Sequence, residues 1–287
     1  MTATVIITGA SGQLGSALHA AAPAGFRIHA LSRTDLDVTD RQAVNATVRQ
    51  IRPDWIINAA AYTAVDQAES DPAAAERLNA QAPGGLAEAA RAEGGRLLHV
   101  STDYVFDGAA TTPYQPGDPA RPINVYGQTK WRGEQAAQAA SEDDAVIVRT
   151  AWLWHHTGRN FFTTMRQLIA EKPEVRVVND QFGAPTHVDN LAHALWRFVE
   201  ASAPGGVYHC TSSGQTTWYG FARAIREQMA RAGLQSLANV QPVPSSEFPT
   251  EASRPAFSVL DCSSTERIIG AMRPWQAPLQ AGHPEHS

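Results

Sequence analysis

Hydrophobic residues in the first half of the chain occur in short, nearly unbroken runs rather than in alternation with polar residues. Five of these runs cover residues 4–7, 26–31, 55–57, 96–100 and 145–148. A strand that is apolar at successive positions is buried on both faces, which is typical of a parallel sheet with helices on either side. The runs therefore predict five parallel strands.

Helical segments separate the predicted strands. The alanine-rich stretch at residues 71–91 is the clearest of them. Strands that alternate with helices form βαβ crossovers, and repeated crossovers build a doubly wound α/β fold. The pattern predicts a Rossmann-type dinucleotide-binding domain over residues 1–150.

The regular alternation weakens after this point. Trp152, Trp154, Trp218 and Tyr219 appear among connections that are rich in Gly, Pro and Ser. This composition predicts that residues 151–287 mainly form a smaller, loop-rich substrate-binding lobe.

Two segments of this second half are predicted to differ from the rest of the lobe. A further βα unit is expected to rejoin the central sheet, with residues 175–178 as its strand and residues 188–199 as its helix. The tail at residues 276–287 is polar, offers nothing to pack, and is expected to be mobile.

Charge and composition limit the binding partners, the cellular location and the role of the cysteines. The 287 residues carry a formal net charge of −5 with scattered Lys and Arg, which argues against nucleic acid and anionic membranes. No apolar run approaches the roughly 20 residues of a membrane span, and no signal-peptide pattern opens the chain, so we expect a cytoplasmic protein. Cys210 and Cys262 have no CxxC or metal-ligand spacing and are expected to be reduced structural thiols.

A glycine-rich loop follows the first predicted strand directly. Its GxxGxxG pattern removes side chains where a backbone must approach a pyrophosphate, and it opens a helix whose N-terminus favours negative charge. This placement after the first strand predicts dinucleotide binding by a loop consisting of Gly9, Ser11, Gly12, Gln13, Leu14 and Gly15.

The end of the second predicted strand indicates which nicotinamide cofactor is used. An acidic residue there would hold the ribose of NAD and repel a 2′-phosphate, but this chain has Ser32 and Arg33. We therefore expect NADPH, with NADH as the alternative cofactor and an exposed surface arginine as the alternative role of Arg33. Further cofactor contacts are expected from Asp37, Val38, Ala59, Ala60, Ala61 and Tyr62.

Three residues could transfer a proton to a carbonyl. Tyr126 and Lys130 lie four residues apart, hence on one face of a helix, and a nearby cation favours the anionic form of a phenol. Lys130 could also hold the ribose hydroxyls of the cofactor. Thr102 ends the fourth predicted strand, where its hydroxyl could share the carbonyl oxygen with Tyr126.

This trio in a GxxGxxG protein resembles the extended short-chain dehydrogenase/reductase superfamily. The resemblance implies that the nicotinamide gives a hydride to a carbonyl carbon, that Tyr126 gives the proton, and that Thr102 binds the oxygen. It also implies that Lys130 orients the cofactor.

Longer strings narrow the resemblance to the dTDP-4-dehydrorhamnose reductases, among them residues 59–66, 101–108, 149–152 and 180–186 together with Arg254-Pro255. Members of that family reduce the 4-keto group of dTDP-4-dehydro-L-rhamnose to dTDP-L-rhamnose with NADPH, a step of carbohydrate biosynthesis. The resemblance implies a dTDP-sugar substrate. Its contacts are expected from Thr102, Asp103, Tyr104, Trp152 and Arg254, the last at the pyrophosphate.

One departure from that family concerns metal. Some members join two subunits through Mg²⁺ held by glutamates, and this chain has Ser16-Ala17 at the first such position and Asp189 at the second. We therefore expect no metal and no metal-bridged dimer, and a monomer or weak homodimer.

Two other functions share many of these features. A nucleotide-sugar epimerase or dehydratase uses the same trio, although a dehydratase usually has Glu where Asp103 follows Thr102. A non-catalytic NADP-binding subunit, like the regulatory subunit of methionine adenosyltransferase, also resembles this branch. The intact Thr102, Tyr126 and Lys130 argue against this non-catalytic subunit, and Asp103 argues against a dehydratase.

Overall fold

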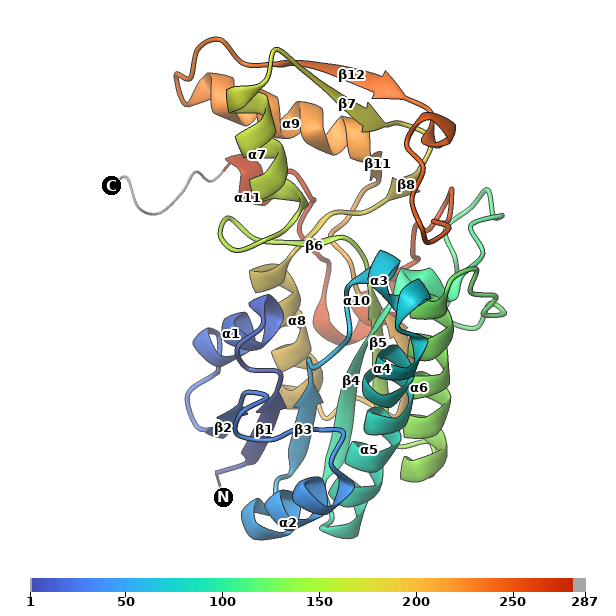
Figure 1. Cartoon of the computed structure of the whole chain (residues 1–287). Coiled ribbons are helices and arrows are strands. Elements are labelled where there is room, and N and C mark those ends of the chain that lie inside the picture. The colour runs from blue at the N-terminus through green and yellow to red at the C-terminus, as the bar shows by residue number, and fades with distance from the viewer. Residues whose placement is uncertain (1, 281–287) are drawn as a thin grey trace.

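A six-stranded parallel sheet forms the lower part of the computed structural model, which describes residues 2–280 (Figure 1). The five predicted strands are confirmed as neighbours within this sheet, and a sixth strand completes it at one edge. In spatial order the strands are β10 (Gly206–His209), β5 (Val146–Thr150), β4 (Arg96–Thr102), β3 (Trp55–Asn58), β1 (Thr4–Thr8) and β2 (Arg27–Leu31).

Helices cover both faces of the sheet and explain the unbroken apolar runs. Val5 and Ile7 of β1 belong to one core cluster, whereas Ile6 between them belongs to the cluster on the opposite face. β1 is therefore apolar at successive positions because both of its faces are buried. One face packs against α1 (Gln13–Ala20) and α8 (Val188–Glu200), and the other against α2 (Arg41–Ile51), α5 (Ala82–Ala92) and α6 (Val125–Ser141).

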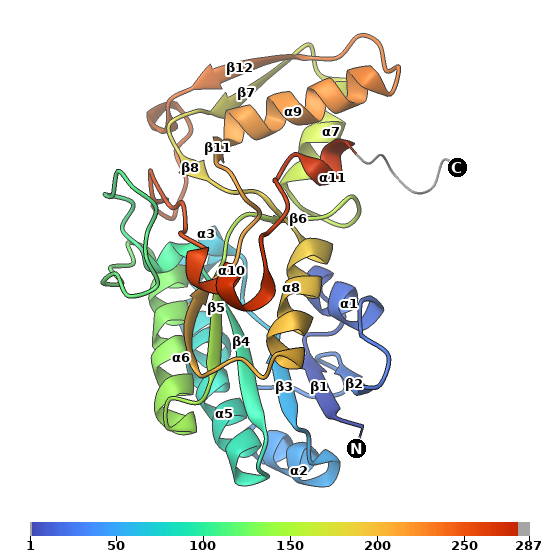
Figure 2. The ribbon, with the colours of Figure 1, turned by 180° about the vertical axis from the view of Figure 1, so that it is seen from behind.

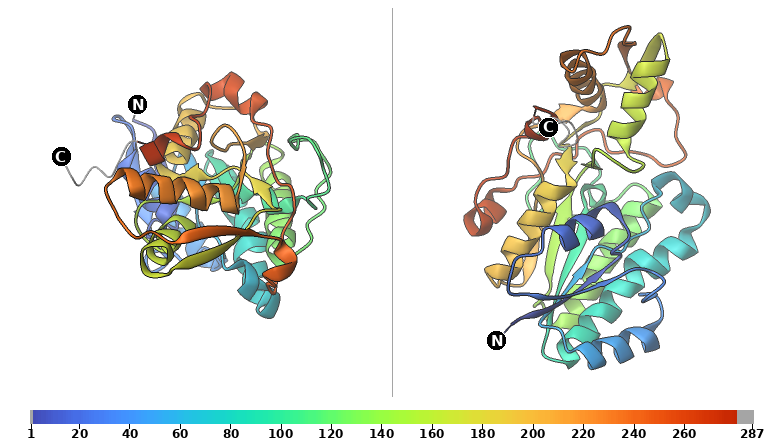
Figure 3. Two further views of the ribbon diagram at one scale, coloured as in Figure 1. Left: turned by 90° about the horizontal axis from the view of Figure 1, so that it is seen from above. Right: turned by 90° about the vertical axis from the view of Figure 1, so that its left-hand side faces the viewer.

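A smaller lobe lies above the carboxyl edge of the sheet, as Figures 1 and 2 show from opposite sides. Its core contains Trp154, Phe162 and Phe221, and the view from above in Figure 3 shows its long helix beside a two-stranded ribbon. The lobe is built from α7 (Phe161–Glu171), α9 (Trp218–Arg231), α11 (Ala277–Gln280), the parallel pairs β7 (Glu174–Val178) with β12 (Asn239–Val243) and β6 (Leu153–Trp154) with β9 (Thr186–His187), and the antiparallel pair β8 (Phe182–Gly183) with β11 (Thr216–Thr217).

The strand predicted near residue 175 does not rejoin the central sheet, so that prediction is wrong. It is β7, which pairs only with β12 in the upper lobe, and the sixth strand of the central sheet is β10 instead. Along β7 buried Val175 and Val177 alternate with exposed Glu174 and Arg176, so only one of its faces is covered. The predicted helix at residues 188–199 is α8 and does pack on the central sheet.

The first part of the predicted mobile tail, residues 276–280, is packed instead. Leu279 of α11 is buried beside Trp275 and Phe221, because the apolar side chains after Pro274 close one end of the upper core. The rest of the expected mobile tail, residues 281–287, lies outside the described residues.

The helix predicted at residues 71–91 is interrupted. It is preceded by α3 (Val65–Ser70) and consists of α4 (Pro72–Ala75), a π-helical turn (Glu76–Gln81) and α5. A π turn often marks a functional region. Here it directs Asn79 onto the backbone of Tyr62, whose N–H it accepts at 2.8 Å and whose carbonyl it meets at 3.0 Å.

Short helical segments complete the described chain. They are the 3-10 turns Asp103–Val105 and Ser245–Glu247 and the helix α10 (Ser263–Ile269). Across residues 2–280, every helix is either too short or too polar to cross a bilayer.

Candidate active site

The glycine loop joins β1 to α1 in a turn that admits no side chains at two positions. Gly9 has a φ of +69°, and a Cβ there would lie 2.7 Å from the backbone nitrogen of Ala60. A Cβ on Gly15 would lie 2.1 Å from the carbonyl oxygen of Gly9. The loop thus packs tightly against its own helix and against the end of β3.

The N-terminus of α1 has the properties of an anion site. Gly12 caps it without a side-chain hydrogen bond, and no acidic residue lies in the first turn. The backbone N–H groups and the helix dipole are therefore not neutralised by the chain itself, which fits the pyrophosphate of a dinucleotide. Leu14 is buried in the core, so only its backbone could take part.

The residues after β2 form a compact polar turn. The Asp35 carboxylate accepts hydrogen bonds from the backbone N–H of Ser32 at 2.9 Å and from its hydroxyl at 2.5 Å. The side chain of Arg33 is 87% exposed and its Nε lies 4.0 Å from the carboxylate of Asp37. Arg33 is thus free to move toward a ligand, whereas Ser32 is engaged by an acid that sequence reasoning missed.

The chain after β3 is held from two sides. Asn58 accepts the hydroxyl of Thr8 at 2.7 Å and the N–H of Ala60 at 3.1 Å, and its amide nitrogen lies 3.0 Å from Nδ1 of His99. Together with the Asn79 contacts to Tyr62, these bonds fix residues 59–62 at the carboxyl edge of the sheet. Val38 is buried in the adjoining core, whereas Asp37 forms a turn with Thr39.

The predicted proton-transfer residues meet at the carboxyl edge of the sheet. Thr102 ends β4, and its hydroxyl is near enough to that of Tyr126 on α6 to lower the pKa of this phenol. Asn124 caps this helix by accepting the N–H of Gly127 at 2.7 Å. The Tyr104 ring meets the Tyr126 ring edge-on, with centroids 5.6 Å apart.

Lys130 lies one turn further along α6 and is almost fully buried. Its Nζ donates to the carbonyl of Val100 at 2.6 Å and lies 3.4 Å from Nε2 of His99. Burial lowers the pKa of Lys130 to about 8, although Glu134 acts in the opposite direction. Burial and the charge of Lys130 also hold the pKa of His99 well below its usual range.

The pKa of Tyr126 differs from the sequence-based expectation. Burial raises it to about 12, whereas the nearby Thr102 hydroxyl acts in the opposite direction. The expected stabilisation of the phenolate by Lys130 does not prevail because the ammonium is turned toward the Val100 carbonyl. A phenol with this pKa is protonated at neutral pH, which is the form that can donate a proton.

Asp103 is buried beneath this pair. Its Oδ2 accepts the hydroxyl of Ser258 at 2.6 Å, and its Oδ1 accepts that of Thr102 at 3.1 Å. Burial raises the pKa of Asp103 to about 6, although both hydrogen bonds lower it. The carboxylate is therefore positioned to orient Thr102 and to tie β4 to the segment that carries Ser258.

Two stacked tryptophans line the upper lobe. The Trp152 and Trp218 rings are parallel within 7° and their centroids lie 3.6 Å apart. Trp152 has a φ of +48°, in a region that bulky residues rarely occupy. Gly183 packs on the same ring, because a Cβ there would lie 2.5 Å from it.

Arg254 already has an anionic partner. Its two terminal nitrogens meet the carboxylate of Asp66 at 3.1 and 2.7 Å. It also lines a cavity of about 270 Å³ in the upper lobe together with Trp218, Phe161 and Gln181. A phosphate could bind Arg254 there only by sharing it with Asp66 or displacing that residue.

Known proteins resemble this chain over nearly its whole length. The family described as RmlD substrate binding domain matches residues 3–284. The dTDP-4-dehydrorhamnose reductase of Burkholderia thailandensis is 42% identical over 281 residues, which cover 94% of each chain. The solved structure of the Bacillus anthracis dTDP-4-dehydrorhamnose reductase in complex with NADP has a TM-score of 0.91 and 37% identity, covering 98% of each chain. That of the Clostridium acetobutylicum dTDP-4-dehydrorhamnose reductase has a TM-score of 0.90 and 36% identity, covering 97% of each chain.

Proposed function

The chain belongs to the dTDP-4-dehydrorhamnose reductase family, and we propose that it reduces the 4-keto group of dTDP-4-dehydro-L-rhamnose to give dTDP-L-rhamnose, with NADPH as reductant. The observation that carries this proposal is the meeting of Thr102, at the end of β4, with Tyr126 and Lys130, on α6, at the carboxyl edge of the sheet. That edge is where α/β folds of this type bind their ligands. Both the glycine loop and Lys130 adjoin the same edge.

The cofactor would lie along this edge and supply the hydride when bound. Backbone groups at the start of α1 would hold the pyrophosphate, and Ser32 and Arg33 would meet the 2′-phosphate. The proposed cofactor site consists of Gly9, Ser11, Gly12, Gln13, Leu14, Gly15, Ser32, Arg33, Asp37, Val38, Ala59, Ala60, Ala61, Tyr62, Tyr126 and Lys130.

Three side chains of the protein would act on the substrate carbonyl. Thr102, whose hydroxyl proton is donated to Asp103 in the free chain, would turn that proton to the carbonyl oxygen, and Tyr126 would transfer its proton to the same oxygen as negative charge develops there. Lys130, charged and buried, would stabilise the phenolate that remains and bind the ribose hydroxyls. Because the pKa of Tyr126 is high, the phenol stays protonated until the carbonyl oxygen becomes basic enough to take the proton.

The upper lobe would bind the nucleotide sugar. Trp152, Trp218 and Arg254 offer aromatic faces and a cation beside the 270 Å³ cavity, which suits a sugar nucleotide with two phosphates. Tyr104 would reach the hexose from the Tyr126 side.

The partners of the chain follow from this activity. We propose that it acts in the cytoplasm on a dTDP-sugar, as a monomer or weak homodimer. Gel filtration over a range of concentrations would test the last point, and a stable higher assembly would contradict it.

The dehydratase alternative is less well supported. A dehydratase needs a free acid beside the catalytic threonine to expel a hydroxyl, and both oxygens of Asp103 are engaged by Ser258 and Thr102. An epimerase or a non-catalytic NADP-binding subunit would retain the same cofactor contacts.

Turnover separates these alternatives. NADPH oxidation should be followed by absorbance with dTDP-4-keto-6-deoxy sugars before and after epimerisation, and the epimerised L-rhamno form should be reduced. No reduction of this form, alongside fast reduction of another keto-sugar nucleotide, would overturn the substrate assignment. Tight NADPH binding without any turnover would favour the regulatory subunit.

A further inference from the structure

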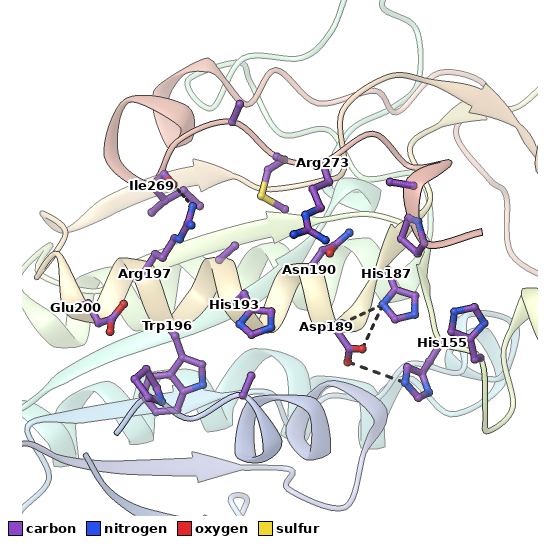
Figure 4. A pocket seen from close by; sticks show the side chains of 18 of the residues that line it. His155, His187, Asp189, Asn190, His193, Trp196, Arg197, Glu200, Ile269 and Arg273 are labelled. Carbon is purple, nitrogen blue, oxygen red and sulfur yellow. Dashed lines mark hydrogen bonds and ion pairs between the residues drawn. The ribbon is translucent and has the colours of Figure 1, made fainter. Parts of the chain in front are cut away.

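Two histidines and a carboxylate gather at the N-terminus of α8, beside a cavity of about 820 Å³ (Figure 4). His187 ends β9, and Asp189 lies in the first turn of α8. His155 comes from the segment after β6, a strand that pairs with β9 so that Trp154 lies opposite His187. Strand pairing thus brings together residues whose separation in the sequence gives no metal-binding signal.

The three donor atoms are close enough to share one ion. Nε2 of His155 lies 4.0 Å from one Asp189 oxygen, and Nδ1 of His187 lies 3.7 Å from the other. All three groups offer ligand atoms within 4.8 Å of one another. A tetrahedral ion with bonds of about 2.0–2.1 Å separates its ligand atoms by about 3.4 Å, so closure requires side-chain shifts of roughly an ångström or less.

Local hydrogen bonds leave both imidazoles able to bind. Nδ1 of His187 accepts only a long bond of 3.4 Å from the N–H of Asp189, and its other ring nitrogen is buried without a partner. In His155, Nδ1 accepts the Thr157 N–H at 3.3 Å and lies 2.9 Å from the Thr157 hydroxyl. Binding an ion through Nε2 therefore moves the ring proton to Nδ1, where that hydroxyl can accept it.

We propose that His155, His187 and Asp189 form a binding site for a divalent first-row transition metal, of the class of Zn²⁺, Co²⁺ and Ni²⁺. Two imidazoles and one carboxylate suit these ions, whereas Mg²⁺ and Ca²⁺ prefer oxygen donors throughout. The Asp189 side chain is 53% exposed and the site borders the cavity, so water completes the coordination. The proposal replaces the sequence-based expectation that the chain holds no metal.

The site lies beside the glycine loop rather than at the reacting groups. The segment that follows His155 reaches this loop through Gln13, whose amide donates to the carbonyl of Arg159 at 3.0 Å and whose oxygen lies 3.3 Å from Asn160. A metal bound to His155 would hold this segment against α8. It would thereby stabilise the contacts that the segment makes with Gln13 of the glycine loop.

Cobalt binding tests the site without reference to turnover. Protein freed of metal by a chelator should be titrated with Co²⁺, with binding followed by visible absorption and calorimetry. Wild type should bind one ion per chain, with the absorption bands of a nitrogen-coordinated Co²⁺, and the ion should raise the unfolding temperature. His155→Ala and Asp189→Asn should each weaken binding at least about 10-fold.

His193→Ala is the matched control, because His193 lines the same cavity, is exposed, and lies outside the cluster. It should bind Co²⁺ as wild type does. His187→Asn keeps an N-cap for α8 while removing the imidazole, and His155→Ala alters only a loop side chain, so folding losses cannot hide the result. The proposal is overturned if wild type binds no Co²⁺, or if His193→Ala weakens binding as much as His155→Ala does.

Discussion

The lower and upper parts of the active site are held in different ways. In the lower part, buried hydrogen bonds hold Thr102 on Asp103 and Lys130 on the Val100 carbonyl, with Tyr126 beside Thr102, so these groups have fixed positions. In the upper part, the groups that would contact the sugar nucleotide instead contact other side chains. Trp152 stacks on Trp218, and Arg254 forms an ion pair with Asp66. Preorganised groups favour the transition state, whereas groups that must exchange partners lose part of their binding energy. Substitutions in the lower part should therefore reduce turnover, and substitutions in the upper part should mainly reduce the affinity for the substrate.

The largest effect is expected from Tyr126→Phe. It removes one hydroxyl and leaves α6, the ring and Lys130 in place, so kcat should fall by about 10²–10⁴-fold, or about 3–5 kcal/mol of transition-state stabilisation. NADPH affinity, measured by fluorescence on the same preparations, should change far less. Lys130→Ala should reduce both, because Lys130 is proposed to contact ribose and phenol. Equal kcat for Tyr126→Phe and wild type would remove Tyr126 from the mechanism.

The pH dependence of the free energy of unfolding tests whether burial raises the pKa of Asp103 in the lower part of the site. Folded Asp103 has a pKa of about 6 and an unfolded aspartate one of about 3.9, so the folded chain binds more protons between these values. Its contribution therefore makes the folded chain less stable as pH rises from about 4 to 6, by about 3 kcal/mol in total, and leaves no further slope above that window.

Asp103→Asn should remove this contribution. Urea unfolding at intervals across the window would show it as a difference in slope between variant and wild type. Parallel curves for the two proteins would mean that the buried carboxyl titrates as it does in the unfolded chain.

A pair of substitutions in the upper part tests whether Arg254 serves the substrate or only Asp66. If Arg254 binds the pyrophosphate, Arg254→Ala should raise KM for the sugar nucleotide by about 10–100-fold, because a charge-assisted hydrogen bond contributes about 1.5–3 kcal/mol. Asp66→Asn frees Arg254 from its partner and should leave KM unchanged or lower it. Steady-state kinetics at saturating NADPH measure both variants. A similar rise in KM for both would indicate a purely structural ion pair.

The same contrast explains what the sequence could predict. The five strands of the central sheet were predictable because burial on both faces leaves unbroken apolar runs, and Gly9, Thr102 and Tyr126 follow from their positions on those elements. β10 was missed because Gly206, Tyr208 and His209 give no such run, although the alternating charges of β7 were a readable sign that it lies elsewhere.

Contacts between distant segments were beyond sequence reasoning. The bond from Asn79 to Tyr62 depends on a π turn, and the meeting of His155 with Asp189 depends on the register of two-residue strands. The sequence separation of neither pair of residues matches a motif that would reveal the contact. The division of the chain near residue 150 and the assigned site residues stay predictions that the experiments above address.

The smallest effect is expected at the edge of the lower part, where Arg33 is held by little except a 4.0 Å contact with Asp37. A mobile guanidinium that meets a 2′-phosphate in solvent should contribute near the lower end of a charge-assisted bond, about 1.5 kcal/mol. Arg33→Ala should therefore reduce the ratio of kcat/KM for NADPH to that for NADH by about 10-fold, mainly through the NADPH term. Arg49→Ala, which removes another exposed arginine on α2, should leave the ratio unchanged and controls for the general loss of positive charge. An unchanged ratio in Arg33→Ala would place the choice of cofactor elsewhere, and Asp35, which already engages Ser32, would be the next residue to change.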